Sequence, residues 1–469
     1  ILKELLEKDE LEIIDTIETL QNKFIISEVK GTDKIGFKFT HQKLREYIYM
    51  KQSEIRRKIL HNKVGDIIEK EIRNEKADID LYHKLIYHYS NGENKIKVLF
   101  YKIKSLNYYL SFSHELFPIL TNTDKEAYKY AYFSTQQTTK SLKEIEKLLK
   151  DIKKESKEEQ EVEKLEMSYL HIKGRYLIRG GEYDIGTNCI TEMIKKALAV
   201  KDKDYALEGY KQMIYFCIQT NNTDLMLKYI DLALELAVEC NYHKEIGILL
   251  RLKGLYKTMC GEYEEAEKFL NESIAIFNVT EQVANKYSLN IAAAYNYIGE
   301  IRRFNKKFSE AMEYYDKAIK ICEDKNALSS LVVFNINAGQ AAFDMLEYTK
   351  AKEYFKKAYD LYEKFDSVWK KSILESFMTL IYIKEENYNK ALESLKNAEI
   401  NSKKMKNPHE IGITYKVKAT VKRYMQKNPE IKKVFNSYLQ EDFDYYYNEA
   451  IMFLKESKID YEIESIKNL

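Results

Sequence analysis

Mostly small residues return at an almost constant spacing through the last two thirds of this 469-residue chain, and no other feature of the sequence constrains the fold as strongly. The first column comprises Gly174, Ile214, Gly254, Gly299, Gly339, Thr379 and Ala419, separated by 40, 40, 45, 40, 40 and 40 residues. A second column follows twelve residues behind it at Gly186, Met226, Ala266, Ala311, Ala351, Ala391 and Ile431. Such columns are typical of helical hairpins stacked into a solenoid, because small side chains let antiparallel helices approach closely.

The composition agrees with an all-α fold. The chain has only three prolines and fifteen glycines, the residues that helix interiors exclude most strongly. Lysines and arginines number 76 against 74 aspartates and glutamates, so no overall charge attracts nucleic acid or an anionic membrane. Five cysteines without a CxxC spacing favour reduced thiols, and no apolar run is long enough to span a bilayer. We therefore expect a cytoplasmic protein without membrane contact.

The first third of the sequence has a different pattern. Residues 9–22 read as an amphipathic helix and residues 24–29 and 35–39 as two strands, after which a helix capped by Thr40 is predicted to continue to about residue 70. This order predicts a small winged-helix unit over residues 1–70. The first helix holds five carboxylates and no Lys or Arg, so it would repel phosphates, and we expect no direct contact with nucleic acid.

The remaining boundaries follow from where the repeat is visible. Residues 71–160 are helical and rich in tyrosine but lack the 40-residue match, which predicts an irregular helical connector. The solenoid is predicted to span residues 161–469 and to end in C-terminal capping helices, because the last unit loses its alanines. The five extra residues between Gly254 and Gly299 are expected in a loop at 278–286.

The columns resemble the tetratricopeptide repeat, which has a small residue in its first helix and an aromatic and two alanine positions in its second. The resemblance covers about residues 161–469, and the longer pitch of 40 residues implies longer helices. It also implies that the first helix of each pair lines a concave groove. Candidate contacts to a ligand or partner in this groove are Arg175, Arg179, Lys211, Tyr215, Arg251, Asn296, Arg303 and Gln340. Because basic residues prevail near its start, we expect a peptide, a protein or a small anionic inducer.

Residues 39–46 read FTHQKLRE and resemble the F-[ST]-H-D-x-[IL]-R-E corner in the winged-helix domain of STAND-class signalling ATPases. The pairs Leu60-His61 and His88-Tyr89 also fall where that family has them. The resemblance implies the C-terminal part of a bacterial transcriptional regulator of the SARP or large LuxR-activator type, with an ATPase domain upstream. It assigns His41 a contact to ADP or ATP in the full-length protein. Gln42 stands where the family has Asp, and a neutral amide anchors an imidazole less strongly than a carboxylate.

Patterns for independent chemistry are weak. GTDKIGFK at residues 31–38 approaches a phosphate-binding loop, but Phe37 stands in place of the lysine and no Ser or Thr follows. The sequence contains neither HExxH nor G-x-S-x-G. We therefore expect no catalytic residues, no metal and no cofactor of its own in this chain.

The favoured function is a regulatory sensor or protein-interaction module that binds an inducer or partner in the groove and controls an upstream ATPase. Binding would act by favouring one of two forms of that ATPase. Two alternatives remain open, a stand-alone tetratricopeptide scaffold for protein interactions and a peptide-pheromone receptor.

Overall fold

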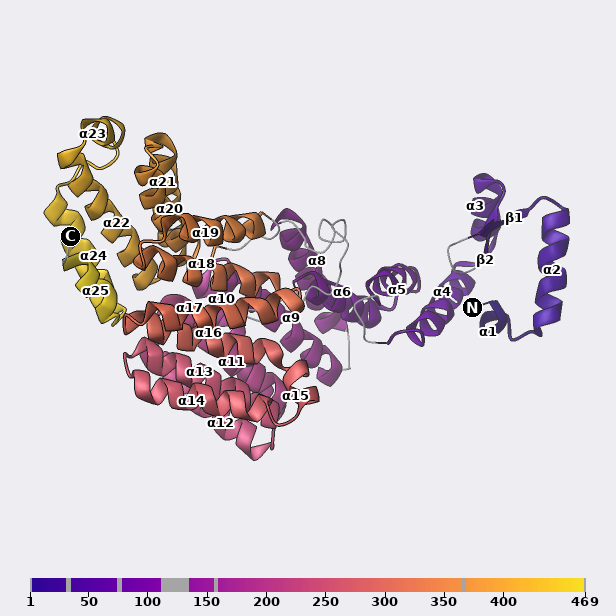
Figure 1. Ribbon diagram of the computed structural model, residues 1–469. Coiled ribbons are helices and arrows are strands. Elements are labelled where there is room, and N and C mark those ends of the chain that lie inside the picture. Colours follow the sequence, from indigo (N-terminus) through magenta and orange to yellow (C-terminus); the bar gives the residue numbers. More distant parts are fainter. Residues whose placement is uncertain are drawn as a thin grey trace. The chain divides into compact units, whose positions relative to one another are not determined.

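The computed structural model describes residues 2–30, 35–73, 78–110, 135–155, 159–363 and 368–467 (Figure 1). Its contacts divide the chain into two compact units. The first comprises the described residues up to 110 and from 135 to 169, and the second comprises those from 170 onward. The boundary therefore falls inside one helix, α9.

The first unit contains a single described hairpin among its helices. Its elements are α1 (Leu2–Leu6), α2 (Glu10–Asn22), β1 (Ile26–Lys30), β2 (Ile35–Phe39), α3 (Gln42–Lys51), α4 (Glu54–Glu69), α5 (Ile79–Asn91), α6 (Lys95–Tyr109), α8 (Thr135–Glu155) and the start of α9 (Glu159–Arg179). The strands pair antiparallel, with Ile26 opposite Phe39. The order of helix, hairpin and helix agrees with the prediction.

The predicted helix from Thr40 to about residue 70 is wrong in two respects. Thr40 does not cap it, because its hydroxyl donates back to the carbonyls of Phe24 and Ile25 at the end of the hairpin. His41 takes the N-cap position of α3 without a side-chain hydrogen bond. The helix also stops at Lys51, since Ser53 adopts an extended backbone and caps α4 by accepting from the Arg56 N–H at 3.3 Å.

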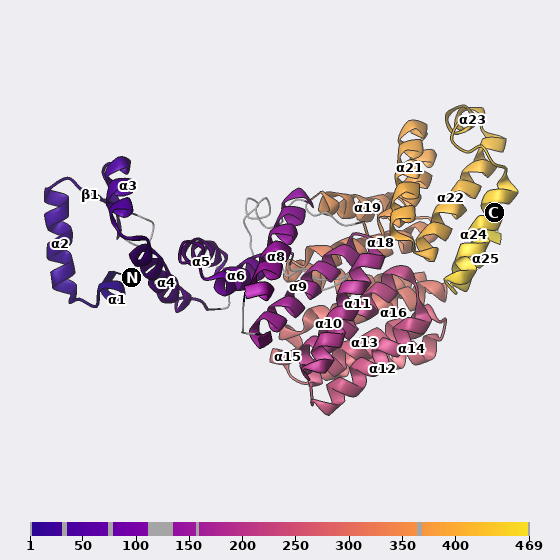
Figure 2. The same ribbon diagram turned by 180° about the vertical axis from the view of Figure 1, so that it is seen from behind.

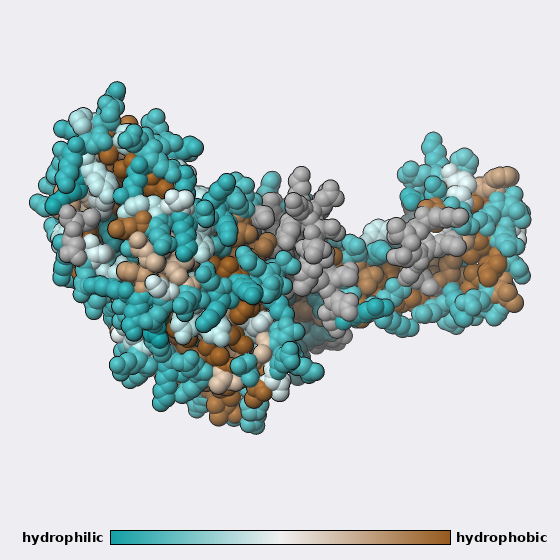
Figure 3. All heavy atoms as spheres, in the orientation of Figure 1, coloured by the Kyte–Doolittle hydropathy of each residue, from teal (hydrophilic) through white to brown (hydrophobic). Residues whose placement is uncertain are grey.

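The core of the first unit lies between α4, α5 and α6 rather than around the hairpin. It consists of the buried residues Ile68, Tyr82, Leu85, Tyr89, Val98 and Tyr101. By contrast, α1 and α3 contain no buried residue, and Leu11 and Phe24 are 70% and 80% exposed. Figure 3 shows brown, apolar atoms on the surface of these N-terminal elements. Since they enclose no core of their own among the described residues, the winged-helix assignment stays a prediction.

The second unit is the solenoid of helical hairpins that the 40-residue period predicts. Its pairs are α9 with α10 (Tyr183–Ala199), α11 (Lys203–Thr220) with α12 (Thr223–Glu239), α13 (His243–Met259) with α14 (Tyr263–Phe277), α16 (Ser288–Phe304) with α17 (Phe308–Asp324), α18 (Leu328–Asp344) with α19 (Tyr348–Tyr362), α20 (Lys371–Lys384) with α21 (Tyr388–Met405), and α22 (Pro408–Lys427) with α24 (Phe443–Glu456). The pairs follow one another in chain order (Figures 1 and 2). The extra residues before Gly299 form the short helix α15 (Glu281–Lys286).

The column of small residues marks the helix crossings, as expected. A Cβ atom added to Gly299 would lie 2.6 Å from the ring of Tyr315, and one added to Gly339 would lie 2.5 Å from the ring of Phe355. Both rings are fully buried, so neither can withdraw at low cost. The 40-residue period of small residues therefore results from close packing between the two helices of each pair.

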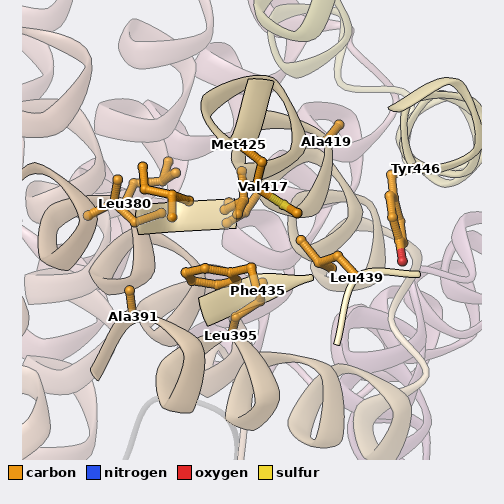
Figure 4. Packing of buried hydrophobic residues seen from close by; sticks show 12 residues of the cluster. Leu380, Ala391, Leu395, Val417, Ala419, Met425, Phe435, Leu439 and Tyr446 are labelled. Atoms are coloured by element: carbon orange, nitrogen blue, oxygen red, sulfur yellow. The ribbon is translucent and has the colours of Figure 1, made fainter. Parts of the chain in front are cut away.

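The last pair departs from the register that the sequence predicts, because the short helix α23 (Pro429–Phe435) is inserted between α22 and its partner α24, and α25 (Asp460–Lys467) follows. Leu380 of α20 and Leu395 of α21 share a core with α22 and α23, together with Ala391, Val417, Ala419, Met425, Phe435, Leu439 and Tyr446 (Figure 4). The Phe435 ring lies among Leu395, Val417 and Met425. Because α24 completes a regular pair with α22, it is not one of the predicted capping helices, and a capping role for α25 stays a prediction.

The first two pairs of the solenoid also contact the junction between its last two pairs, α21 and α22. The Tyr183 hydroxyl at the start of α10 donates to the Met405 carbonyl at the end of α21, over 2.8 Å. The Asn407 amide before α22 donates to the Gln219 carbonyl in α11, also over 2.8 Å. These bonds join segments 222 and 188 residues apart in sequence. The solenoid therefore closes on itself, which a period read along the sequence does not predict.

Candidate ligand cavity inside the solenoid

The closed solenoid surrounds a cavity of about 100 Å³, within a hollow of about 750 Å³ that includes its open mouth. The lining residues are Ile218, Asn221, Leu255, Thr258, Met259, Asn296, Tyr297, Glu300, Phe304, Val333, Trp369, Lys370, Ile373, Asn407, His409, Glu410, Ser457 and Ile459. Most lie in or beside α11, α13, α16, α18, α20 and α22, the first helices of successive pairs. The first helices thus line the inner face, as the repeat predicts.

Lys370 connects four elements at this site. It has a left-handed backbone with φ of 56° and stands immediately before α20. Its ammonium group lies 2.9 Å from the Glu300 carboxylate of α16 and 3.0 Å from the Asn337 carbonyl oxygen of α18. Its backbone N–H donates to the Glu410 carboxylate of α22 over 3.0 Å. The charge of Lys370 is therefore already compensated within the wall of the cavity.

A chain of buried carboxamides runs beside Lys370. The Asn337 amide donates to the Asn296 carbonyl oxygen over 2.9 Å, and the Gln340 amide approaches the Asn337 oxygen at 3.5 Å. All three residues are at most 3% exposed. Nevertheless the Asn296 amide nitrogen and the Gln340 carbonyl oxygen find no hydrogen-bond partner among the described residues. Unpaired buried polar groups are costly, and of these two residues only Asn296 lines the cavity, so its amide marks a place where a polar ligand group would be stabilised.

Burial shifts the pKa of two titratable groups of the wall toward the neutral form. It raises the pKa of Glu410 to about 7, although the Ser372 hydroxyl, the Lys370 N–H and the Lys370 charge all favour the carboxylate. Burial likewise lowers the pKa of His409 to about 4, helped by the positive charges of Lys370 and Arg303 and opposed by Glu462. The Nε2 atom of His409 has no partner within the described ranges. Beside the Lys370–Glu300 ion pair, the cavity consequently offers a neutral imidazole and a carboxyl group that is partly protonated near pH 7.

Only some of the predicted groove residues lie at the cavity. Asn296 lines the cavity, and Gln340 belongs to its carboxamide chain. Tyr215 is buried in α11, while Arg175 and Arg179 are half-buried in α9. Burial lowers the pKa of Arg175 to about 10, with a further contribution from the neighbouring charge of Arg179.

The three other predicted cations are buried, and two of them are paired. Lys211 lies 2.6 Å from Glu208 and 2.8 Å from Glu245. Arg303 lies 2.7 Å from Asp344 and 2.9 Å from Glu462. The expectation of a basic groove therefore overlooked the carboxylates that compensate these charges.

Arg251 differs from them. It is fully buried, it lies over the ring of Tyr297, and its Nη1 donates to the Tyr297 hydroxyl over 3.4 Å. No carboxylate pairs with it among the residues that the structure describes, and its Nε and Nη2 find no partner there. Arg251 contacts Tyr297, which lines the cavity, but Arg251 is not itself a lining residue.

The repeat pattern did not predict the cavity residues that lie just before the helices. Trp369 and Lys370 precede α20 and Asn407 precedes α22, so none occupies a repeat position inside a helix. Two signals were available: Trp369 is the single tryptophan of the chain, and Asn407 followed by Pro408 is a strong helix-start pair. Neither signal indicates that these residues face the same cavity.

Other predicted features lie outside this cavity. His41 is exposed at the start of α3 in the first unit, and its contact to a nucleotide stays a prediction. Among the described residues, no cluster of three or more His, Cys, Asp or Glu side chains has the arrangement of a metal site. Within the same residues, no helix has both the length and the apolar character required to cross a membrane.

Comparison with known proteins finds similar solved structures but no similar family model or curated sequence. No protein-family model matches the sequence, and no curated protein is similar to it. The solved structure of a Rap conjugation gene regulator in complex with a peptide is 13% identical with a TM-score of 0.49, covering 88% of this chain and 96% of that one. The apo quorum sensor NprR from B. thuringiensis is 15% identical with a TM-score of 0.48, covering 81% and 98%.

A third solved structure spans this whole chain. It is a signal transduction ATPase with numerous domains (STAND) from Pyrococcus horikoshii that carries a tetratricopeptide repeat sensor. The identity is 14% and the TM-score 0.44. This chain covers 62% of the length of that protein.

Proposed function

We propose that this chain is the sensor module of a signal-transduction regulator and that its solenoid binds a short peptide, or a peptide segment of a partner protein, in the inner cavity. The observation that carries the proposal is the cavity lined by Asn296, whose buried amide nitrogen has no hydrogen-bond partner among the described residues. A peptide carbonyl supplies an acceptor for the Asn296 amide.

The remaining lining favours a peptide over a charged small molecule. Lys370 is paired with Glu300, and Glu410 accepts from Ser372 and the Lys370 N–H, so no charge in this part of the wall awaits a counter-ion. Ile218, Leu255, Val333, Ile373 and Trp369 provide an apolar surface for a side chain. Mostly apolar walls with a few orienting polar groups are the usual composition of a ligand site.

The proposal includes regulation of an ATPase domain. Its support is the sequence resemblance at residues 39–46, and the exposed position of His41 leaves the imidazole accessible to such a domain. Ligand binding would favour one arrangement of the sensor over another, and the ATPase would respond to that difference. In this proposal the chain has no catalytic role of its own and binds no metal.

A peptide library provides the direct test. Short synthetic peptides are selected on the immobilised chain, and the selected peptides are then assayed by titration calorimetry with the wild type and the Asn296→Ala variant. We expect at least one peptide to bind, and the variant to bind it about tenfold or more weakly, because a buried hydrogen bond to the ligand is lost.

The matched control is Asn335→Ala. Asn335 is also a buried asparagine of a first helix, but its amide donates to the Leu331 carbonyl and it is not part of the cavity lining. This variant should retain the wild-type affinity. If no peptide is selected, or if both variants bind as the wild type does, the cavity is not a peptide site.

A further inference from the structure

The last helix of the chain, α25, lies against the inner side of the solenoid through an unusual set of charges. Glu462 is fully buried, with its carboxylate 2.9 Å from Arg303 of α16 and 2.8 Å from Lys416 of α22. Glu464 lies 2.7 Å from Lys306, which follows α16. Two glutamates of α25 thus meet three cations from α16, the residues after it, and α22.

Aromatic and apolar contacts complete this seat. The Tyr461 ring packs against the rings of Phe304 and Phe308 and lies under the Arg303 guanidinium, 5.1 Å from its centre. Ile463 and Ile466 are buried on the same helix. We call the surface formed by Arg303, Phe304, Lys306, Phe308 and Lys416 the α25 seat. It matches a short segment that presents a tyrosine and an adjacent glutamate.

The seat keeps its own structure without Glu462. Arg303 remains paired with Asp344 at 2.7 Å, whereas Lys416 would lose both of its contacts to α25, the Glu462 carboxylate at 2.8 Å and the Ser465 hydroxyl at 2.5 Å. Phe304 and Phe308 belong to α16 and α17, and these two helices pack extensively on each other. Removal of α25 would therefore expose a preformed cationic and aromatic surface rather than unfold the repeats.

The seat adjoins the candidate cavity. Phe304 lines the cavity, and its ring packs against the ring of Tyr461 in α25. Ser457 and Ile459, which precede α25, also line the cavity. A displaced α25 would therefore also open that wall.

We propose that the α25 seat is an interaction surface for an acidic, tyrosine-containing protein segment, and that α25 is its internal occupant in this structure. A partner segment with the same chemistry competes with α25, and its binding opens one wall of the cavity. This inference is independent of whether the cavity binds a peptide.

The first experiment measures how firmly α25 is held. Amide hydrogen exchange of residues 457–467 is compared in the wild type, in Glu462→Gln and in the control Glu464→Gln, which breaks only the solvent-exposed pair with Lys306. We expect exchange about tenfold or more faster in Glu462→Gln, with α16 and α22 still protected, and little change in the control. Loss of protection throughout α16 and α22, or no change at residues 457–467, would show that Glu462 belongs to the fixed core and overturn the proposal.

The second experiment tests the partner chemistry. A fluorescent peptide with the sequence of residues 457–467, SKIDYEIESIK, is titrated onto the full Glu462→Gln chain. We expect saturable binding, about tenfold weaker for the same peptide with glutamine at the position of Glu462, and about tenfold weaker to the wild type, whose seat is occupied. Absence of binding, or equal binding of both peptides, contradicts the proposal.

Discussion

At the scale of single residues, Glu410 makes stability depend on pH. Burial raises its pKa to about 7, whereas a glutamate in an unfolded chain titrates near 4.5. The folded protein therefore retains a proton that the unfolded chain releases, and the contribution of Glu410 to the free energy of unfolding falls as the pH rises between these values. The loss amounts to about 1.4 kcal/mol for each pH unit across that interval.

Glu410→Gln should remove this dependence. Glutamine can keep both hydrogen bonds, accepting from the Lys370 N–H and donating to the Ser372 hydroxyl. We expect the melting temperature of the variant, relative to the wild type, to rise progressively from about pH 5 to about pH 8. His409, whose pKa burial lowers to about 4, has the opposite effect, but it is present in both proteins and cancels in the difference. A constant difference across this range would mean that Glu410 is ionised throughout.

At the scale of the helix pair, Gly339 and Phe355 define the contact between α18 and α19. Gly339→Ala would place a methyl group 2.5 Å from a fully buried ring. We expect a decrease in the free energy of unfolding of about 1–3 kcal/mol, because the helices must move apart or the ring must leave its rotamer. Urea unfolding followed by circular dichroism measures the decrease.

Gly180→Ala is the control for this contact. Gly180 follows α9, and the nearest atoms to an added Cβ are carbonyl oxygens at 3.5 Å, an ordinary contact distance. This variant should unfold close to the wild type. Alanine has the higher helix propensity, so without a packing conflict Gly339→Ala would be as stable as the wild type or more stable. That result would show that close packing does not explain the column of small residues.

At the scale of the whole solenoid, the bonds between its two ends add long-range contacts to a fold that usually has only neighbouring ones. Tyr183→Phe removes the hydroxyl that donates to the Met405 carbonyl and leaves that buried acceptor without its partner. We expect a loss of about 1 kcal/mol and faster amide exchange at the start of α10 and at the junction of α21 and α22. The central pairs should keep their protection.

Tyr229→Phe, in α12 and outside this closure, is the matched control and should leave exchange at the junction unchanged. If Tyr183→Phe leaves exchange at the junction unchanged as well, the ends are held by other contacts.

The sequence by itself determined the first six helical pairs and their crossings, because small residues at a fixed spacing mark close contacts between neighbouring helices. It also placed the hairpin and its flanking helices in order. It did not predict the last pair, in which α23 is inserted between α22 and its partner α24. It did not determine the break at Ser53, where a local cap outweighs a continuous apolar pattern. Nor could it show that Lys211 and Arg303 are neutralised, since each is paired at least once with a carboxylate from another helix.

The tertiary structure alone decided the cavity and the α25 seat. Lys370 meets Glu300, 70 residues away, and Arg303 meets Glu462, 159 residues away. A repeat specifies which face of each helix is buried, but small rotations between successive pairs accumulate along the solenoid and decide which distant faces meet. The side chains that line the cavity are brought together by that curvature, which no local pattern of residues encodes.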